Sequence, residues 1–217
     1  MLFLRVVGLS ARRIICALAC AILAVAALAA QDWKTARLDD GKISVRYRIS
    51  ERNSESGDKV PLIEDISTTI AEVNLSSCVS LMKDLPKHKD FTGDYSSEVI
   101  KVISGNEWII YYYTRNPWPI PDSDCVAIMS FSENTERGTA DFKLSAAPDL
   151  LEGRKVNRMS FFDFAYSFRN LGNGTVGIVV TGRTSPPVKV PLWLINSAFP
   201  GAPADGIRKF VKLAKTL

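Results

Sequence analysis

The sequence predicts an α+β protein in which a long antiparallel sheet is covered by an amphipathic helix at the C-terminal end. From Ser96 onward, almost a hundred residues carry strand-like patterns separated by Gly, Asn and Pro. Residues 190–217 instead have the apolar spacing of a helix. Beyond residue 30 the chain holds roughly 187 residues, which is the size of one domain with a sizeable core.

Residues 1–30 have the three-part layout of a secretory signal. A basic start precedes an apolar run, and small residues follow, with Ala27 and Ala29 suited to signal peptidase. Cleavage is expected after Ala29 or Ala30. The alternative is an uncleaved membrane anchor, because the apolar run is nearly long enough to span a bilayer. In either case we expect a periplasmic or secreted protein, of bacterial type from the style of the signal.

The charge of the remaining chain does not indicate a nucleic-acid-binding function. Of the 27 Lys and Arg residues three lie in the N-terminal segment, which leaves 24 basic against 23 acidic residues. No block of basic residues with interleaved aromatics is present. We therefore expect no nucleic-acid partner.

Few residues of the kinds that bind metals or carry out catalysis remain beyond residue 30. Cys78 and Cys125 could form a disulfide in an exported protein, or could be two buried apolar side chains, and the sequence leaves both open. The single histidine, His88, stands among lysines and is expected on a helix surface. Nothing indicates a metal site or a cofactor.

The first part of the domain predicts two strands and a short helix. Residues 42–49 alternate apolar and charged side chains, and residues 62–73 are rich in β-branched residues, so both ranges predict strands. Residues 75–85 predict a helix that Asn74 or Ser76 can cap and that Pro86 closes.

Six further strands and a helix are predicted from there to the C-terminus. The strands are expected at residues 97–103, 107–114, 125–132, 140–147, 157–168 and 175–183, joined by short connections that favour an antiparallel meander. In the terminal helix, Ile207, Phe210 and Ala214 fall on one face, with basic residues off it. Pro200 and Pro203 should kink or break this helix near its middle.

Large apolar side chains recur at every second position of the predicted strands. In residues 157–168, Phe162, Phe164, Tyr166 and Phe168 share one face. By the same alternation Cys125, Ala127, Met129 and Phe131 share one face of their strand. Such a stripe can line a cavity or fill an ordinary core, and the pattern alone leaves both interpretations open.

Two segments resemble START lipid-transfer domains. The stretch "YYYTRNPWPIPDSDCVAIMSFS" is similar to the family's strand that runs into a Pro-aromatic-Pro loop and a following strand. "VPLWLIN" followed by a basic amphipathic helix resembles the family's last helix, and "DLPKHKDF" fits a third family position. The resemblance covers Trp33 to Leu217 in the right order, and looks closest to the phosphatidylcholine-transfer-like branch.

The resemblance implies a helix-grip fold for residues 31–217, a curved antiparallel sheet around a long C-terminal helix with an internal hydrophobic cavity. It implies a monomer that holds one phospholipid or sterol-like ligand and touches membranes transiently. The expected cavity-lining residues are Trp108, Tyr112, Cys125, Ala127, Met129, Phe131, Phe162, Phe164, Tyr166, Phe168 and Trp193. Those expected at the cavity mouth and in membrane contact are Trp118, Ile120 and Phe199.

The chain departs from the family pattern at three positions. The usual Arg-Asp pair reads Ser123-Asp124 here, Met129 aligns with a basic residue of some sterol-binding members, and Phe91 stands where Trp is common. An ion pair that contacts a ligand headgroup therefore does not carry over to this chain.

Two other functions are compatible with the sequence. Related helix-grip domains include cyclases and hydrolases, for which Asp163, Glu98 and His88 are the candidate acids and bases. No nucleophile elbow or phosphate-binding motif accompanies them, so no catalytic residue is predicted. A protein-binding module with a filled core is the third alternative.

Overall fold

The computed structural model describes residues 33–217, and Thr35–Leu217 form one compact unit. The predictions of a cleaved signal or an anchor at residues 1–30 fall outside the described residues. Within residues 33–217, no helix combines the length and the apolar character needed to cross a membrane.

One sheet of 10 strands makes up most of the protein. Its order is β1-β2-β3-β10-β9-β7-β6-β5-β4, with β8 pairing β6. The strands are β1 (Lys34–Leu38), β2 (Ile43–Asn53), β3 (Lys59–Glu72), β4 (Ser96–Ser104), β5 (Glu107–Thr114), β6 (Ser123–Asn134), β7 (Thr139–Ala146), β8 (Asn157–Arg158), β9 (Phe162–Gly172) and β10 (Thr175–Thr184). The β6–β8 pair is short and parallel. The neighbouring strands from β2 to β4 in the sheet order are antiparallel.

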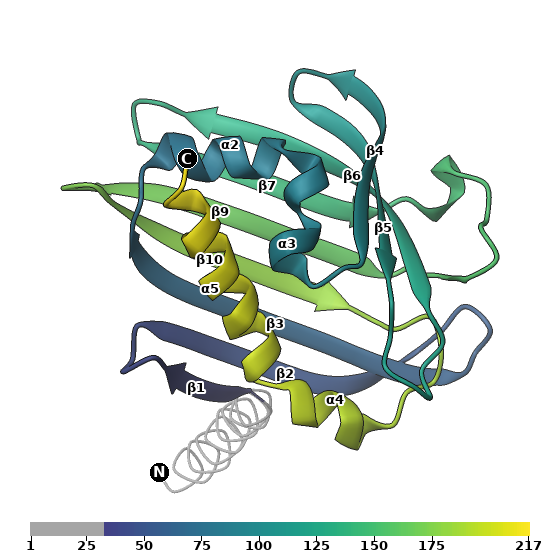
Figure 1. Ribbon diagram of the computed structural model, residues 1–217. Helices are drawn as coiled ribbons and strands as arrows, with labels where there is room; N and C mark the ends of the chain where they lie inside the picture. The colour runs from purple at the N-terminus through teal and green to yellow at the C-terminus, as the bar shows by residue number, and fades with distance from the viewer. Residues whose placement is uncertain (1–32) are drawn as a thin grey trace, which may run out of the picture. The chain divides into compact units, whose positions relative to one another are not determined.

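Helices cover one face of this sheet. They are α2 (Leu75–Lys83), α3 (Lys89–Thr92), α4 (Leu192–Ala198) and α5 (Gly201–Ala214), with 3-10 turns at Leu85–Lys87 and Pro148–Leu150. In Figure 1, α2, α3 and α5 all lie in front of the same face of the sheet. The predicted α+β class, an antiparallel sheet packed against a long C-terminal helix, is confirmed.

The sheet is not a simple meander. β3 pairs with β10 along its length, from Glu72 opposite Thr175 to Ile63 opposite Thr184. The N-terminal strands therefore extend the sheet beyond the C-terminal hairpin, and the chain from β3 to β4 crosses the covered face as α2 and α3 (Figure 1). This pairing joins segments far apart in sequence, so strand patterns alone do not predict it.

The C-terminal helix is amphipathic, as its spacing predicts. α5 buries Ala204, Ile207, Phe210 and Ala214, which recur every three or four residues and so share one face. The helix is broken at Pro200, which separates α4 from α5 because a proline donates no backbone hydrogen bond and crowds the preceding turn.

The prediction of one continuous strand at residues 157–168 is wrong, because the range contains parts of two strands. β8 ends at Arg158, and β9 begins only at Phe162. Arg158 donates to both carboxylate oxygens of Asp124, over 2.5 and 2.9 Å, and the Met159 amide donates to the Asp124 carbonyl over 2.8 Å. These bonds hold β8 beside β6. Residues 159–161 then connect β8 to β9, which pairs with β7.

Candidate functional site

A cavity of about 420 Å³ lies between the covered face of the sheet and the helices α3, α4 and α5. Its walls are mostly apolar, with Ile178 and Val180 from β10, Leu144 from β7 and Phe210 from α5 among them. Alternation along each strand explains the lining, because every second side chain of a strand points to the same face. The volume lies toward the lower end of the range of small-molecule sites, about 300–1,000 Å³.

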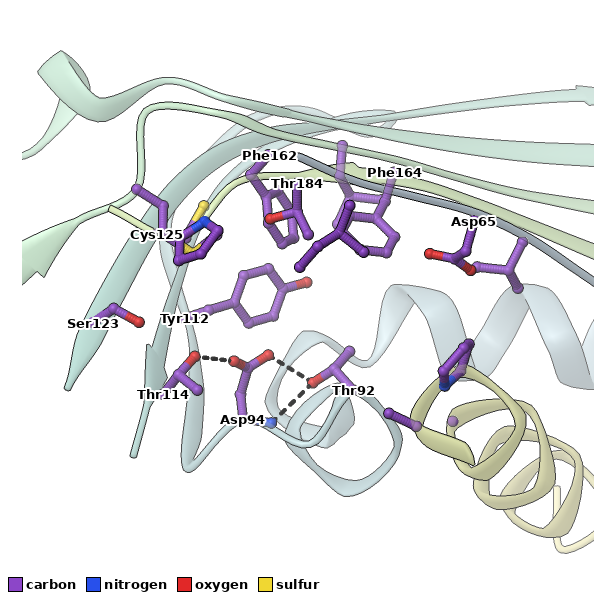
Figure 2. A pocket seen from close by; sticks show the side chains of 18 of the residues that line it. Asp65, Thr92, Asp94, Tyr112, Thr114, Ser123, Cys125, Phe162, Phe164 and Thr184 are labelled. Atoms are coloured by element: carbon purple, nitrogen blue, oxygen red, sulfur yellow. Dashed lines mark hydrogen bonds between the residues drawn. The ribbon is translucent and has the colours of Figure 1, made fainter. Parts of the chain in front are cut away.

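Several of the residues singled out from the sequence line this cavity. They are Tyr112, Cys125, Phe162, Phe164, Tyr166, Ile120 and Phe199. Figure 2 shows Tyr112 of β5 facing the same space as Phe162 and Phe164 of β9. Whether these side chains contact a ligand stays a prediction.

For five residues the prediction that they line the cavity is wrong. Trp108, Ala127, Met129, Phe131 and Phe168 lie on the covered face, but in a solid core with residues of α2. A strand rises about 3.3 Å per residue, so Met129 lies about 13 Å along β6 from Cys125, beyond the hollow part of the sheet. Alternation predicts the face of a side chain and not its position along the strand.

Trp193 is also outside the cavity. Its side chain is 70% exposed, whereas Ile195 is buried and lines the cavity. Residues two positions apart in a helix are separated by about 200° around its axis, so the inward position of Ile195 turns Trp193 outward. Leu192 is partly exposed as well, so α4 presents apolar side chains to solvent next to the cavity.

The loop at residues 115–122, which carries the Pro-Trp-Pro motif, is held in place by Asp122. Its carboxylate accepts hydrogen bonds from the Tyr113 hydroxyl over 2.5 Å and from the Asn116 amide over 3.1 Å. The hydrogen bond from Tyr113 lowers the pKa of Asp122. Trp118 stands at the tip of this anchored loop and is 92% exposed, while Ile120 lines the cavity.

Two carboxylates that the sequence analysis did not single out lie in the cavity wall, on opposite sides (Figure 2). Asp94 follows α3 and accepts hydrogen bonds from Thr114 over 2.5 Å and from Thr92 over 2.7 Å. Asp65 projects from β3 and accepts one from Ser67 over 3.2 Å. Burial raises the pKa of both carboxyls, that of Asp65 to about 6.

A signal for Asp65 was present in the sequence. The alternation of β3 puts Asp65 on the same face as Ile63 and Ser67, so an inward acid could have been found from the strand pattern. Asp94 gave no such signal, because it lies in the connection between α3 and β4, where neither the strand nor the helix period applies.

The prediction of a surface histidine is wrong. His88 is 1% exposed, its Nε2 lies 2.8 Å from the Met82 carbonyl, and its Nδ1 lies 2.6 Å from the Tyr112 hydroxyl. Since a carbonyl only accepts, Nε2 donates and Nδ1 accepts from the tyrosine. Burial lowers the pKa of His88 to about 4, so the ring is neutral at pH 7 and fixes Tyr112 in the cavity wall.

The ion pair between Asp124 and Arg158 is not part of the cavity. Asp124 is fully buried beneath the segment that carries Arg158, and neither residue lines the hollow. The pair thus holds β8 beside β6. Of the described cysteines, Cys78 and Cys125 are both free and buried, the first on the inner face of α2 and the second in the cavity wall.

Of the three catalytic candidates from the sequence, His88 contacts the wall residue Tyr112, while Glu98 and Asp163 do not line the cavity. Glu98 is exposed and lies 3.7 Å from Arg154, and Asp163 is on the face of β9 opposite Phe162 and Phe164. Among residues 33–217, no group of His, Cys, Asp and Glu side chains is placed to hold a metal ion.

The chain is similar to several known proteins. No protein-family model matches it. An uncharacterised protein of Pseudomonas aeruginosa is 26% identical over 194 residues, which cover 88% of this chain and 91% of that protein. A STAR-related lipid transfer protein from Xanthomonas axonopodis has a similar structure, with a TM-score of 0.70, 22% identity, and coverage of 85% of this chain and 99% of that one.

More distant structures share the architecture. The human StAR-related lipid transfer protein 5 matches with a TM-score of 0.64 and 17% identity, over 93% of this chain and 97% of that one. The Zhui aromatase/cyclase from Streptomyces sp. R1128 matches with a TM-score of 0.52 and 6% identity, over 71% of this chain and 94% of that one. The chain therefore has the START-like helix-grip fold, with its cavity between the sheet and the last helix.

Proposed function

We propose that this protein binds one apolar molecule of lipid type in its cavity and carries or presents it between membranes, as a monomer and without chemistry. The observation that carries the proposal is the hollow of about 420 Å³ at the place where sheet and C-terminal helix would otherwise form a solid core. Atoms that face an empty apolar space lose packing contacts, and a ligand of matching shape restores them. Two proteins of known structure with this fold, from Xanthomonas axonopodis and from human, are lipid transfer proteins, which supports the same function.

The energetics of such a carrier are close to balanced. Removing apolar surface from water is worth about 25 cal/mol per Å², whether the surface moves into a bilayer or into the protein. Transfer from one membrane to another therefore needs no reaction, only apolar walls that shield the ligand on the way. Phe162, Phe164 and Val180 would supply such walls.

Exposed apolar side chains at the cavity mouth support a transient contact with membranes. Trp118 and Trp193 are exposed on elements that also line the cavity through Ile120 and Ile195. Tryptophan favours the interface between water and lipid, because its ring is apolar and its N–H is polar. The exposed Lys189 lies in the connection to α4 and would add attraction to anionic headgroups.

The test is transfer of a fluorescent lipid between vesicles, with two variants of the same strand. Val180→Phe adds bulk to the cavity, whereas Val179→Phe adds the same bulk to the opposite, partly exposed face of β10. We expect Val180→Phe to abolish transfer and Val179→Phe to leave it within two-fold of the parent protein. Equal transfer by both variants would refute a cavity carrier.

An enzyme on an apolar substrate is the alternative, which the similar fold of the Zhui aromatase/cyclase supports. The acids that line the cavity, Asp65 and Asp94, would then be the candidate acid and base, in place of Asp163 and Glu98. The alternative requires that an extracted ligand change chemically on incubation with the protein. It also requires that this change stop in the variants Asp65→Asn or Asp94→Asn.

Export remains part of the proposal. A carrier with a signal at residues 1–30 would act in the periplasm or outside the cell, either released or held to one membrane by an uncut N-terminus. The intact mass of the protein from the cell envelope distinguishes these forms, because cleavage after Ala29 or Ala30 removes the whole apolar run.

A further inference from the structure

We propose that the cavity selects an apolar molecule whose polar end is a protonated amine, and that the Asp65 carboxylate binds this amine. The inference rests on the proposed function, because it names the chemical class of the ligand for the same cavity. The observations that carry it are the position of Asp65, the charges of the cavity wall, and the way the other buried acids are paired.

Asp65 is a buried carboxylate for which residues 33–217 supply no cationic partner. It is 8% exposed and points from β3 into the cavity (Figure 2). Its Oδ2 accepts one hydrogen bond, from the Ser67 hydroxyl, and no described residue donates to its Oδ1. A buried charge without a partner costs free energy, so this carboxylate gains from a cation that enters the cavity.

Other buried acids of this protein have arginine partners. Glu64, the neighbour of Asp65 in the chain, pairs with Arg48 and Arg183 on the other face of the sheet. Asp124 is bound by Arg158 through both of its oxygens. The structure thus compensates buried carboxylates elsewhere, and Asp65 differs from them in facing the cavity instead of an arginine.

The backbone next to Asp65 leaves room for its carboxylate. Gly182 of β10 is paired with Asp65 across the sheet. A Cβ atom at Gly182 would lie 2.7 Å from Asp65 Oδ1 and 2.6 Å from a ring atom of Phe164. Glycine at this position therefore lets a carboxylate and an aromatic ring lie side by side in the wall, which is the combination that binds an ammonium group attached to an apolar body.

The charges of the cavity have one sign. Its described lining includes the carboxylates of Asp65 and Asp94 and several hydroxyl groups, but no Lys, Arg or His. A phosphate or carboxylate headgroup would meet two acids in an environment of low dielectric constant, where like charges repel strongly. A cationic group meets the opposite field, so the lining favours an amine over an anionic lipid.

Asp94 has a different role from Asp65. Each of its oxygens accepts a threonine hydroxyl, and these bonds hold it in the opposite wall. Thr92 Oγ1 also lies 2.9 Å from the His88 carbonyl, and a single hydroxyl proton serves both acceptors. Asp94 therefore adds to the negative potential, while Asp65 has the free lone pairs that an amine needs.

The experiment measures binding of three amphiphiles with the same alkyl chain: tetradecylamine, tetradecanol and tetradecanoate. Displacement of a fluorescent apolar probe from the purified protein at pH 7.5 gives the three dissociation constants. We expect the amine to bind at least about ten-fold more tightly than the alcohol, as for a hydrogen bond to a charged group, and the carboxylate to bind most weakly. In Asp65→Asn the affinity for the amine should fall to that for the alcohol. The dissociation constant of the alcohol should stay within two-fold of its value in the parent protein.

Controls separate this inference from the proposed function. Asp163→Asn removes an acid of β9, two strands from β3, on the face of the sheet opposite the cavity, and should leave all three constants unchanged. Equal binding of amine and alcohol, or tightest binding of the carboxylate, would overturn the amine preference while the cavity carrier stands. Failure of all three to bind would overturn both. Circular dichroism of Asp65→Asn shows whether the variant is folded.

Discussion

The covered face of the sheet has two ends, and only one of them is filled. At the filled end, α2 packs Leu81 and Met82 against Met129, Phe142 and their neighbours in a solid core. At the hollow end, the same strands carry Cys125, Tyr166 and Phe164, but α3, α4 and α5 stand over a cavity of about 420 Å³. The side chains at the two ends are similar, so the covering helices, and not the composition of the strands, determine where a ligand site forms.

The comparison of the two ends predicts that a cavity-forming substitution lowers the free energy of unfolding most at the filled end. Phe142 is fully buried and packs against Phe131 with ring centroids 4.6 Å apart. Phe142→Ala should lower the free energy of unfolding by about 3–5 kcal/mol, because it opens a cavity in a packed core. Phe164→Ala only enlarges an existing space and should cost less than half as much while weakening ligand binding. Urea unfolding measures both, and equal losses of stability would contradict the division into two ends.

A second prediction concerns Asp65, whose pKa burial raises from 3.8 to about 6. A carboxyl with a raised folded-state pKa destabilises the protein once it ionises. This penalty is absent below pH 4, grows between pH 4 and 6, and is fully present above about pH 6. Asp65→Asn should therefore stabilise the ligand-free protein at pH 7.5 by up to about 3 kcal/mol, and much less at pH 4.

Urea unfolding of delipidated protein at the two pH values checks this difference. Tyr112, Tyr166 and Asp94 also face the cavity, but the variant leaves these groups in place. A loss of stability in Asp65→Asn at pH 7.5 would mean that the carboxylate is compensated inside the protein. It would also remove the reason for a cationic ligand.

A third, smaller effect is expected at the glycines of β10. Gly182→Ala would place its Cβ 2.6 Å from the Phe164 ring, so Phe164 and Asp65 must shift. We expect a cost of about 1–3 kcal/mol in stability, as for an overpacked core, and weaker ligand binding. Gly177→Ala is the matched control, because its nearest contact would be an ordinary 3.5 Å to Leu171. Thermal unfolding and probe displacement on both variants would reveal whether the two positions differ.

The smallest effect on stability is expected at the cavity mouth. Trp118→Ala removes an exposed ring and should change the free energy of unfolding by no more than about 0.5 kcal/mol. Its effect should be on vesicle binding, measured by sedimentation with anionic liposomes, because the ring is proposed to enter the lipid interface. Ile70→Ala, an exposed apolar residue at the far end of β3, should leave sedimentation unchanged. Equal sedimentation of the two variants with liposomes would contradict the proposal that the cavity mouth contacts the membrane.

Much of the fold could be predicted from the sequence, because it depends on local patterns. Period-two alternation predicts the strands, and the spacing of Ile207, Phe210 and Ala214 predicts the terminal helix. The split between β8 and β9 was missed, since it depends on the bond between Arg158 and Asp124, which are 34 residues apart. The pairing of β3 with β10 was not predicted either, because it also joins segments far apart in the sequence.

The site could be predicted only in part. Alternation correctly places Cys125 and Met129 on the same, covered face of β6, but it cannot say that only Cys125 reaches the hollow. That difference depends on which helix lies above each strand position. The burial of His88 likewise depends on Tyr112, 24 residues further on, which supplies the partner for its ring. Distances between segments decide these details, and no local pattern contains them.

Native mass spectrometry of the protein purified from cells tests the central claim most directly, followed by solvent extraction and analysis of whatever is bound. We predict one bound apolar molecule per chain in the parent protein and in Val179→Phe, and none in Val180→Phe, whose added ring occupies the cavity. A parent protein without bound mass that also takes up no lipid from vesicles would contradict the claim, as would a ligand retained in full by Val180→Phe.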